Sequence, residues 1–214
     1  MNETSFNFNA FLKESKDVLI SPKSYFSTMK TTGGIVEPLI KALIYGAVAG
    51  IIGFIWYLLH IGGGMVGGAI GIMILVWTFI GAVIGLFIGA VVLLIISAIC
   101  KGSTDFEANT RVTAAVMVVL PISALLGFVS GLNTTAGVIV SLAVNIFSLY
   151  LLYHGLIEAL KAKPGSVRIV MLVIAVLVAL IMLLGIGAKK RANQFMDEFN
   201  KSDFKELMED ANKN

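Results

Sequence analysis

Charged residues are scarce in this chain of 214 residues. Asp, Glu, Lys and Arg together make up 14% of it, whereas a soluble domain carries about 25%. The 57% share of hydrophobic residues and the mean hydropathy of +0.92 agree with that shortage. The composition therefore indicates an integral membrane protein and not a soluble domain.

Cysteine and histidine are also rare. A single cysteine, Cys100, excludes an intramolecular disulfide and a thiolate metal cluster, and we interpret it as a small buried side chain, with reversible palmitoylation as the alternative. The two histidines, His60 and His154, lie near the ends of different predicted spans and offer almost no ligands for metal catalysis. The motifs GxSxG and HExxH, a Walker loop and a dinucleotide fingerprint are all missing. We therefore expect no enzyme activity, no cofactor, no metal and no nucleic-acid partner.

Long apolar segments, in contrast, are abundant. About 20 apolar residues cross the hydrocarbon core of a bilayer. On this basis the sequence predicts an all-α, polytopic membrane helical bundle whose transmembrane domain covers residues 35–188. Its five transmembrane helices are expected at about 38–60, 71–99, 112–132, 138–156 and 167–186. The second of them is unusually long and is expected to tilt or to protrude.

The orientation follows from lysine and arginine near the span ends, which favour a cytoplasmic N-terminus. One feature conflicts with five spans, because the tail that begins with Lys189, Lys190 and Arg191 then falls on the opposite side. A rival division splits residues 39–99 into three short helices and would return the tail to the cytoplasm. We prefer five spans, since three helices within residues 39–99 would leave almost no room for loops between them.

Two polar segments flank the spans. Residues 1–34 contain no cleavable signal peptide, and we predict an N-terminal amphipathic helix there, with a helix start at Ser21 and Pro22. This helix could lie flat on the lipid surface, with its lysines toward anionic head groups, or pack against the bundle; both interpretations stay open. Residues 189–214 form a charged C-terminal tail.

Glycine recurs at every fourth position of GAVIGLFIGA, residues 81–90. Association of helices in lipid depends on close backbone approach, which a row of small residues permits. The alternative is that glycine is simply common in spanning helices. We predict that helices pack through Gly46, Gly50, Gly81, Gly85 and Gly89.

Polar residues inside the predicted spans are few. Ser141, Asn145 and Ser148 share one face of the fourth span, and Pro121, which should kink the third span, lies at a similar depth. These four residues are the candidates for an intramembrane polar site; the alternative is a cross-helix hydrogen bond, worth about 0.6 kcal/mol on average. No charged residue lies deep in a predicted span, which counts against proton-coupled transport.

Charged residues gather instead near span ends. Thr104 and Glu107 predict a capping box at the start of a helix. Arg111 is expected to pair with Asp105 and Glu107 in one interfacial cluster. His154 is expected to pair with Glu158 at i and i+4. The alternative is a cytoplasmic partner surface, composed of Asp105, Phe106, Glu107, Arg111, His154 and Glu158.

Three stretches carry a family resemblance. They are SPKSYFSTMK before the first span, KGSTDFEANTRVTAAVMVVLP leading into the third, and SLYLLYHGLIEALKAKPGSVR leaving the fourth. With Pro22 and Phe26, Gly102 with Phe106 and Arg111, and Gly155, they resemble the Yip family of Ypt/Rab-interacting proteins, in its prokaryotic branch. The resemblance covers roughly residues 20–185 and implies five spans with a cytoplasmic N-terminus in a prokaryotic plasma membrane.

The resemblance also implies partners. Eukaryotic members bind Rab-type GTPases, but their Asp-Leu-x-Gly-Pro stretch is missing here, which counts against that partner. Some bacterial relatives accompany ABC-type exporters. We expect a non-catalytic membrane scaffold or accessory protein that contacts membrane lipids and binds another membrane protein or itself. The alternative is a small transporter or lipid-handling channel with a polar site around Asn145.

Overall fold

A computed structural model describes residues 7–60, 68–182, 184 and 185. Over these ranges the chain is helical and contains no strand. The elements are α1 (Phe8–Ile20), α2 (Pro22–Thr28), α3 (Val36–Leu58), α4 (Gly68–Ile99), α5 (Phe106–Val116), α6 (Val119–Leu126), α7 (Phe128–Leu132), α8 (Thr134–His154) and the π-helical turn η1 (Gly155–Ala159).

Five helices in the described ranges are long and apolar enough to cross a membrane, which confirms the predicted all-α, five-span bundle. They are Val36–Leu58, Val76–Ile99, Phe106–Leu132, Thr135–Ala159 and Pro164–Met182. The chain divides into two units, Met1–Ala175 and Val176–Asn214, and the arrangement below concerns the first. In the second, the described part continues the last helix with exposed apolar side chains. The predicted charged tail, 189–214, lies outside the described residues.

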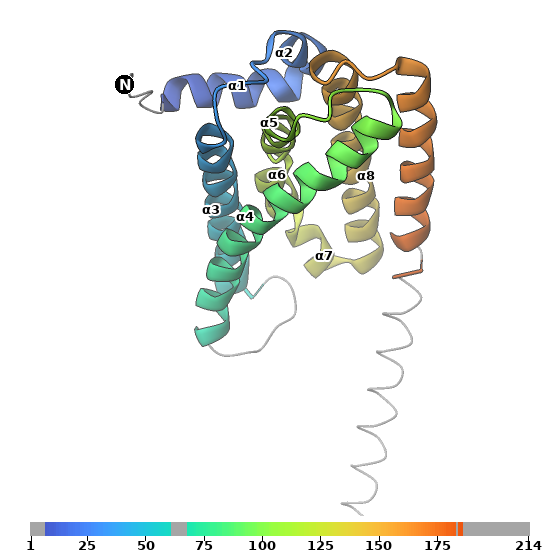
Figure 1. The fold of residues 1–214 in the computed structure, drawn as a ribbon. Helices are drawn as coiled ribbons and strands as arrows, with labels where there is room; N and C mark the ends of the chain where they lie inside the picture. The colour runs from blue at the N-terminus through green and yellow to red at the C-terminus, as the bar shows by residue number, and fades with distance from the viewer. Residues whose placement is uncertain (1–6, 61–67, 183, 186–214) are drawn as a thin grey trace, which may run out of the picture. The chain divides into compact units, whose positions relative to one another are not determined.

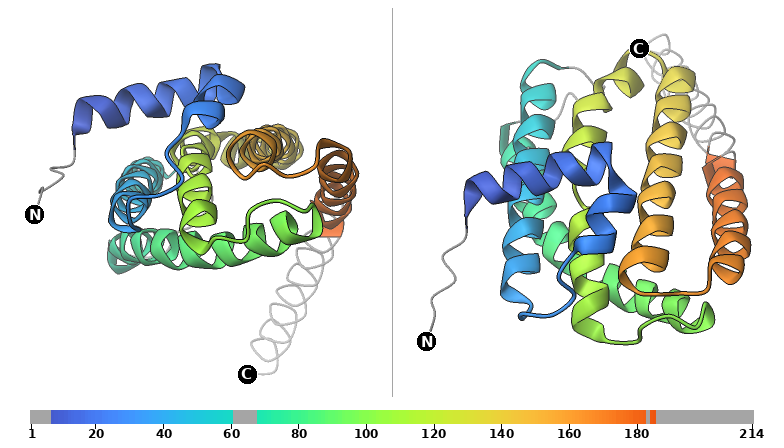
Figure 2. Two further views of the ribbon diagram at one scale, coloured as in Figure 1. Left: turned by 45° about the horizontal axis from the view of Figure 1, so that its top comes forward. Right: turned by 90° about the horizontal axis from the view of Figure 1, so that it is seen from above.

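Helices α1 and α2 lie across one end of the bundle, which we call the covered end (Figures 1 and 2). Phe11 is buried, with its ring centroid 5.1 Å from that of Tyr45 on α3. Ser15 Oγ and Tyr45 Oη form a hydrogen bond of 2.7 Å. The N-terminal segment therefore packs against its own bundle, while Phe8 and Leu12 of α1 stay about half exposed, at 55% and 50%.

Close packing of α3 on α4 depends on Gly46, where an added Cβ would overlap the Cβ of Ala82. At Gly89 an added Cβ would lie 2.9 Å from Thr113 Cγ2 of α5. These two glycines pack as predicted, and Gly50 is buried too.

The prediction is wrong for Gly81 and Gly85, where an added Cβ would meet no atom of the chain within 4 Å. The stripe of α4 that enters the core is the adjacent one, formed by Ala82, Leu86 and Ala90. Neighbouring residues on a helix point about 100° apart, so the glycines are turned away from the core. Figure 1 shows α4 crossing the bundle obliquely, as its length predicted.

The third span is broken one turn before Pro121, between α5 and α6. Proline has no N–H to donate to the carbonyl four residues earlier, which belongs to Met117. Leu120 N donates to Met117 O instead, at 2.9 Å. The predicted kink is confirmed, and a further break follows at Gly127.

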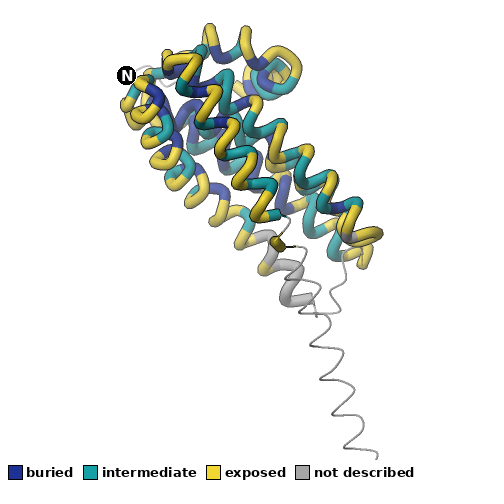
Figure 3. The backbone as a smooth tube through the Cα atoms, turned by 90° about the vertical axis from the view of Figure 1, so that its right-hand side faces the viewer, coloured by how far each residue is buried: buried dark blue, intermediate teal, exposed yellow. Residues whose placement is uncertain are grey.

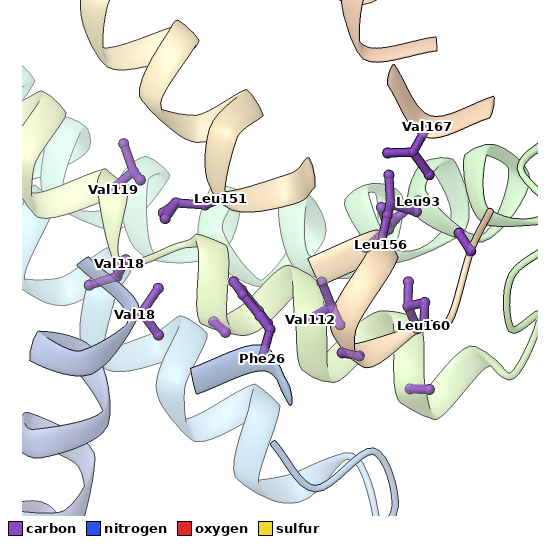
Figure 4. Close-up of a cluster of buried hydrophobic side chains, with 14 of the residues drawn as sticks. Val18, Phe26, Leu93, Val112, Val118, Val119, Leu151, Leu156, Leu160 and Val167 are labelled. Carbon is purple, nitrogen blue, oxygen red and sulfur yellow. The ribbon is translucent and has the colours of Figure 1, made fainter. Parts of the chain in front are cut away.

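The apolar core is concentrated at the covered end, where Phe26, Val112, Leu151 and Leu156 are fully buried (Figure 4). Away from it, large apolar side chains are exposed along the helices. Figure 3 marks the exposed residues in yellow along the helices. An apolar surface of this extent requires a lipid environment and not water.

Candidate functional site

Two glycines hold the loops of the covered end together. An added Cβ on Gly155 would lie 2.5 Å from Val112 Cγ1 and 3.6 Å from Phe26 Cε1, so this glycine lets α2, α5 and η1 meet. Gly102 has the same role beside the last loop, because its Cβ would lie 2.8 Å from that of Ala162. The residues of the sequence motifs therefore converge at this one end.

A chain of ion pairs, which we call the ion-pair network, crosses the covered end. Arg111, only 7% exposed, donates to Glu37 Oε2 at 3.0 Å, to Glu107 Oε1 at 3.2 Å and to Gly34 O at 2.9 Å. Its pairing with Glu107 is as predicted. The contact with Glu37 joins α5 to α3, and the contact with Gly34 fixes the turn before α3.

Lys41 extends the network to α1. Its ammonium group lies 2.5 Å from Glu14 Oε2 and 2.8 Å from Glu37 Oε1. Lys41 is 9% exposed, so the two carboxylates compensate a charge that is almost removed from water. No local sequence pattern predicts the bond to Glu14, because 27 positions separate the two residues.

Asp105 does not belong to the network. Its Oδ1 accepts a hydrogen bond of 2.7 Å from Ala108 N, so Asp105 and not Thr104 is the N-cap of α5. The predicted capping box was therefore wrong by one residue. Glu107, its second member, accepts instead from Gly34 N at 2.6 Å and from Arg111.

The predicted pairing of His154 with Glu158 is also wrong: the two side chains, both described, form no ion pair. The π-helical turn η1 begins directly after His154 and changes the i, i+4 geometry. His154 instead meets Tyr150 edge-on, with ring centroids 4.7 Å apart. Phe106 is 39% exposed and stacks on Phe87. Since Arg111 is buried, the six residues do not share one open surface.

Two polar cavities, of about 430 and 350 Å³, adjoin the ion-pair network. Lys30, Lys41 and Arg111 line both of them. Tyr25 lines the larger one, and burial, followed by the charge of Glu14, raises the pKa of its phenol above the usual range. Its hydroxyl is therefore neutral at every physiological pH.

A third cavity, the lateral groove, opens between α4, the third span and α8, with a volume of about 640 Å³. Gly81 and Gly85 line it, and so do Asn145 and Ser148 of the predicted polar site. Ser141 and Pro121 of the predicted site are not among the lining residues, and the carbonyl of Ser141 accepts from Asn145 Nδ2 at 2.8 Å. The polar residues thus lie on a groove and not around an enclosed site.

The described residues include no group of three or more His, Cys, Asp or Glu side chains placed to hold a metal ion. A family model of the Yip1 domain matches residues 16–186. The chain belongs to the Yip1 family. The Yip1 domain thus extends from within α1 into the last helix; it includes the lateral groove and the covered end except for the first part of α1. No curated protein and no solved structure matches the chain.

Proposed function

We propose that this multi-pass membrane protein is a non-catalytic accessory protein of the Yip type, which binds another membrane protein or a second copy of itself at the covered end. The observation that carries the proposal is the use of the motif residues. Phe26, Gly102, Arg111 and Gly155 all serve to fix α2 and the loops of the covered end in place. Their combined effect is a rigid surface, which suits recognition of a partner.

The electrostatics of the covered end support the same role. The buried cations Lys41 and Arg111 are each paired with two carboxylates. Each buried charge is compensated by an opposite charge, so these residues hold the helices in position and are not free to react. On the outer side of α1, Phe8 and Leu12 remain exposed and available to a partner.

We propose further that the covered end faces the cytoplasm of a prokaryotic cell, since lysines are frequent in α1 and α2 and cytoplasmic flanks of spans are rich in lysine. An ABC-type exporter is the partner class that the family resemblance favours. A Rab-type GTPase is not favoured, because the Asp-Leu-x-Gly-Pro stretch is missing.

Cross-linking in native membranes, followed by purification and mass spectrometry, tests this role. A double variant, Phe8→Ser with Leu12→Ser, is expected to recover much less partner than the unchanged chain. Leu172→Ser is the matched control, because Leu172 is similarly exposed, at 66%, on the last helix. Repeated recovery of the monomer alone from the unchanged chain would overturn the proposal.

A lipid-handling role is the second candidate, and the lateral groove is the observation that favours it. Asn145 faces this groove, which is open to its surroundings and not enclosed by side chains. The chemistry of the groove decides what it could hold.

A further inference from the structure

The lateral groove is long. Its lining on α4 extends from Thr78 to Ile96, which at 1.5 Å per residue is about 27 Å. The hydrocarbon core of a bilayer is about 30 Å thick. Because α4 crosses the bundle obliquely, the groove extends over a depth of that core that is smaller than its own length. Its floor is the kinked third span and its walls are α4 and α8. An occupant must therefore be elongated and must lie among lipid chains.

The lateral groove is also narrow. A volume of about 640 Å³ over about 27 Å corresponds to a mean cross-section of roughly 25 Å². An α-helix, with a diameter of about 10–12 Å, needs roughly 80–110 Å². A helix from a partner or from a second copy could cover the groove but could not fill it. A single hydrocarbon chain is slender enough to enter.

Three polar side chains of the groove donate to carbonyls of their own helices, and Thr78 and Ser123 are the other polar residues that line it. Asn145 Nδ2 donates to Ser141 O at 2.8 Å, Ser148 Oγ to Val144 O at 3.0 Å, and Thr113 Oγ1 to Asn109 O at 2.8 Å. No charged residue lines the groove. The lining thus matches an uncharged, apolar occupant and does not match a polar solute or a head group.

Gly81 and Gly85 leave the wall of α4 bare where the groove passes. A wall without neighbouring atoms loses its dispersion contacts, so an apolar occupant stabilises the fold by restoring them. We propose that the lateral groove is a binding site for one hydrocarbon chain of a membrane lipid. The site is independent of the proposed accessory role, because none of its lining residues belongs to α1 or α2.

Photo-cross-linking of the full chain tests the lipid site directly. The protein is reconstituted in phosphatidylcholine vesicles that contain a diacyl phosphatidylcholine with a diazirine on its acyl chain, and adducts are mapped by mass spectrometry. Adducts on groove segments around Gly85 and Asn145 are expected to exceed those around Leu172, which is exposed on the last helix. Equal adduct density at the two places would mean ordinary surrounding lipid only and would overturn the site.

Leucine substitutions fill the groove. In Gly85→Leu, adducts on groove segments are expected to fall by roughly tenfold relative to those around Leu172, because the new side chain overlaps the path of the lipid chain. Gly81→Leu repeats the test one turn away and decides the question if Gly85→Leu does not fold. Gly185→Leu is the matched control, since an added Cβ there also meets no atom within 4 Å and Gly185 does not line the groove.

Two results contradict the lipid site. One is an unchanged level of groove adducts in a folded leucine variant. The other is cross-linking of groove segments to a second polypeptide in place of lipid. Loss of partner binding in the Phe8→Ser, Leu12→Ser variant bears only on the accessory role, so the two proposals can fail separately.

Discussion

At the scale of single residues, Gly155 has almost no room for a side chain. An added Cβ would lie 2.5 Å from Val112 Cγ1, in the core of the covered end. Gly155→Ala is therefore expected to lower the free energy of unfolding by about 1–3 kcal/mol, the usual cost of overpacking. Thermal unfolding in detergent measures the change. The control is Gly85→Ala, which has open space for the methyl group; an equal loss in both variants would contradict the argument.

The guanidinium group of Arg111 donates hydrogen bonds to Glu107, Glu37 and the carbonyl of Gly34. Replacement of Arg111 by methionine leaves Glu37 and Glu107 without this partner, although both are partly exposed and Glu37 keeps Lys41. We expect a loss of about 1–3 kcal/mol in unfolding free energy, less than the 3–5 kcal/mol of a fully buried pair. Arg111→Lys should recover little of it, because an ammonium cannot reproduce the guanidinium fork. Denaturant unfolding in detergent tests both variants.

Cys100 is fully buried beside the end of α4, as the sequence predicted. Burial raises the pKa of its thiol, so the reactive thiolate is rarer in the folded protein than in the unfolded chain. A polar maleimide at pH 8 is therefore expected to label Cys100 slowly in the folded protein and rapidly after denaturation. Mass spectrometry over time measures the two labelling rates. Equal rates would mean that the thiol is accessible to the reagent in the folded protein.

At the scale of elements, α1 is fastened to α3 by Lys41 and by the packing of Phe11. In Lys41→Met the packing of Phe11 and the hydrogen bond between Ser15 Oγ and Tyr45 Oη remain, and the ion pair with Glu14 is lost. Amide hydrogen exchange in α1 is expected to accelerate by roughly tenfold, while exchange in α8 stays unchanged. Lys16→Met is the control, because Lys16 is an exposed lysine on α1, the helix whose exchange is measured. Unchanged exchange in α1 of the Lys41 variant would show that the ion pairs do not hold this helix.

The helices could be predicted from the sequence because their causes are local. Hydropathy over about 20 residues is enough to find a span, and the missing N–H of Pro121 is enough to break one. The cap of α5 was predicted one residue early, because Thr104 and Asp105 are both good caps and only the backbone decides between them.

The contacts between helices could not be predicted in the same way. Glycine periodicity indicates which residues share a stripe, but the crossing direction of α4 decides whether that stripe meets a neighbour. Gly46 meets Ala82, whereas Gly85 faces the lateral groove. The bond from Arg111 to Glu37 joins residues 74 positions apart, and no local sequence pattern predicts such a contact.

At the scale of the whole molecule, an odd number of spans places the two flanks on opposite sides of the membrane. The chain has five such helices in its described ranges, and we propose that the covered end is cytoplasmic. The basic residues Lys189, Lys190 and Arg191 then lie on the far side, against the usual preference. Under this proposal the earlier spans must override that preference, and the first helix usually dominates the orientation of a membrane protein.

Cysteine labelling separates five spans from six. In a Cys100→Ala background, Lys16→Cys and Lys189→Cys are each expected to react with a membrane-impermeant maleimide from one side only. In right-side-out vesicles the reagent should reach Lys189→Cys and spare Lys16→Cys, and inverted vesicles should reverse the result. Labelling of both positions from the same side would require a sixth crossing, as in the division of residues 39–99 into three short helices, which the single helix α4 (Gly68–Ile99) argues against.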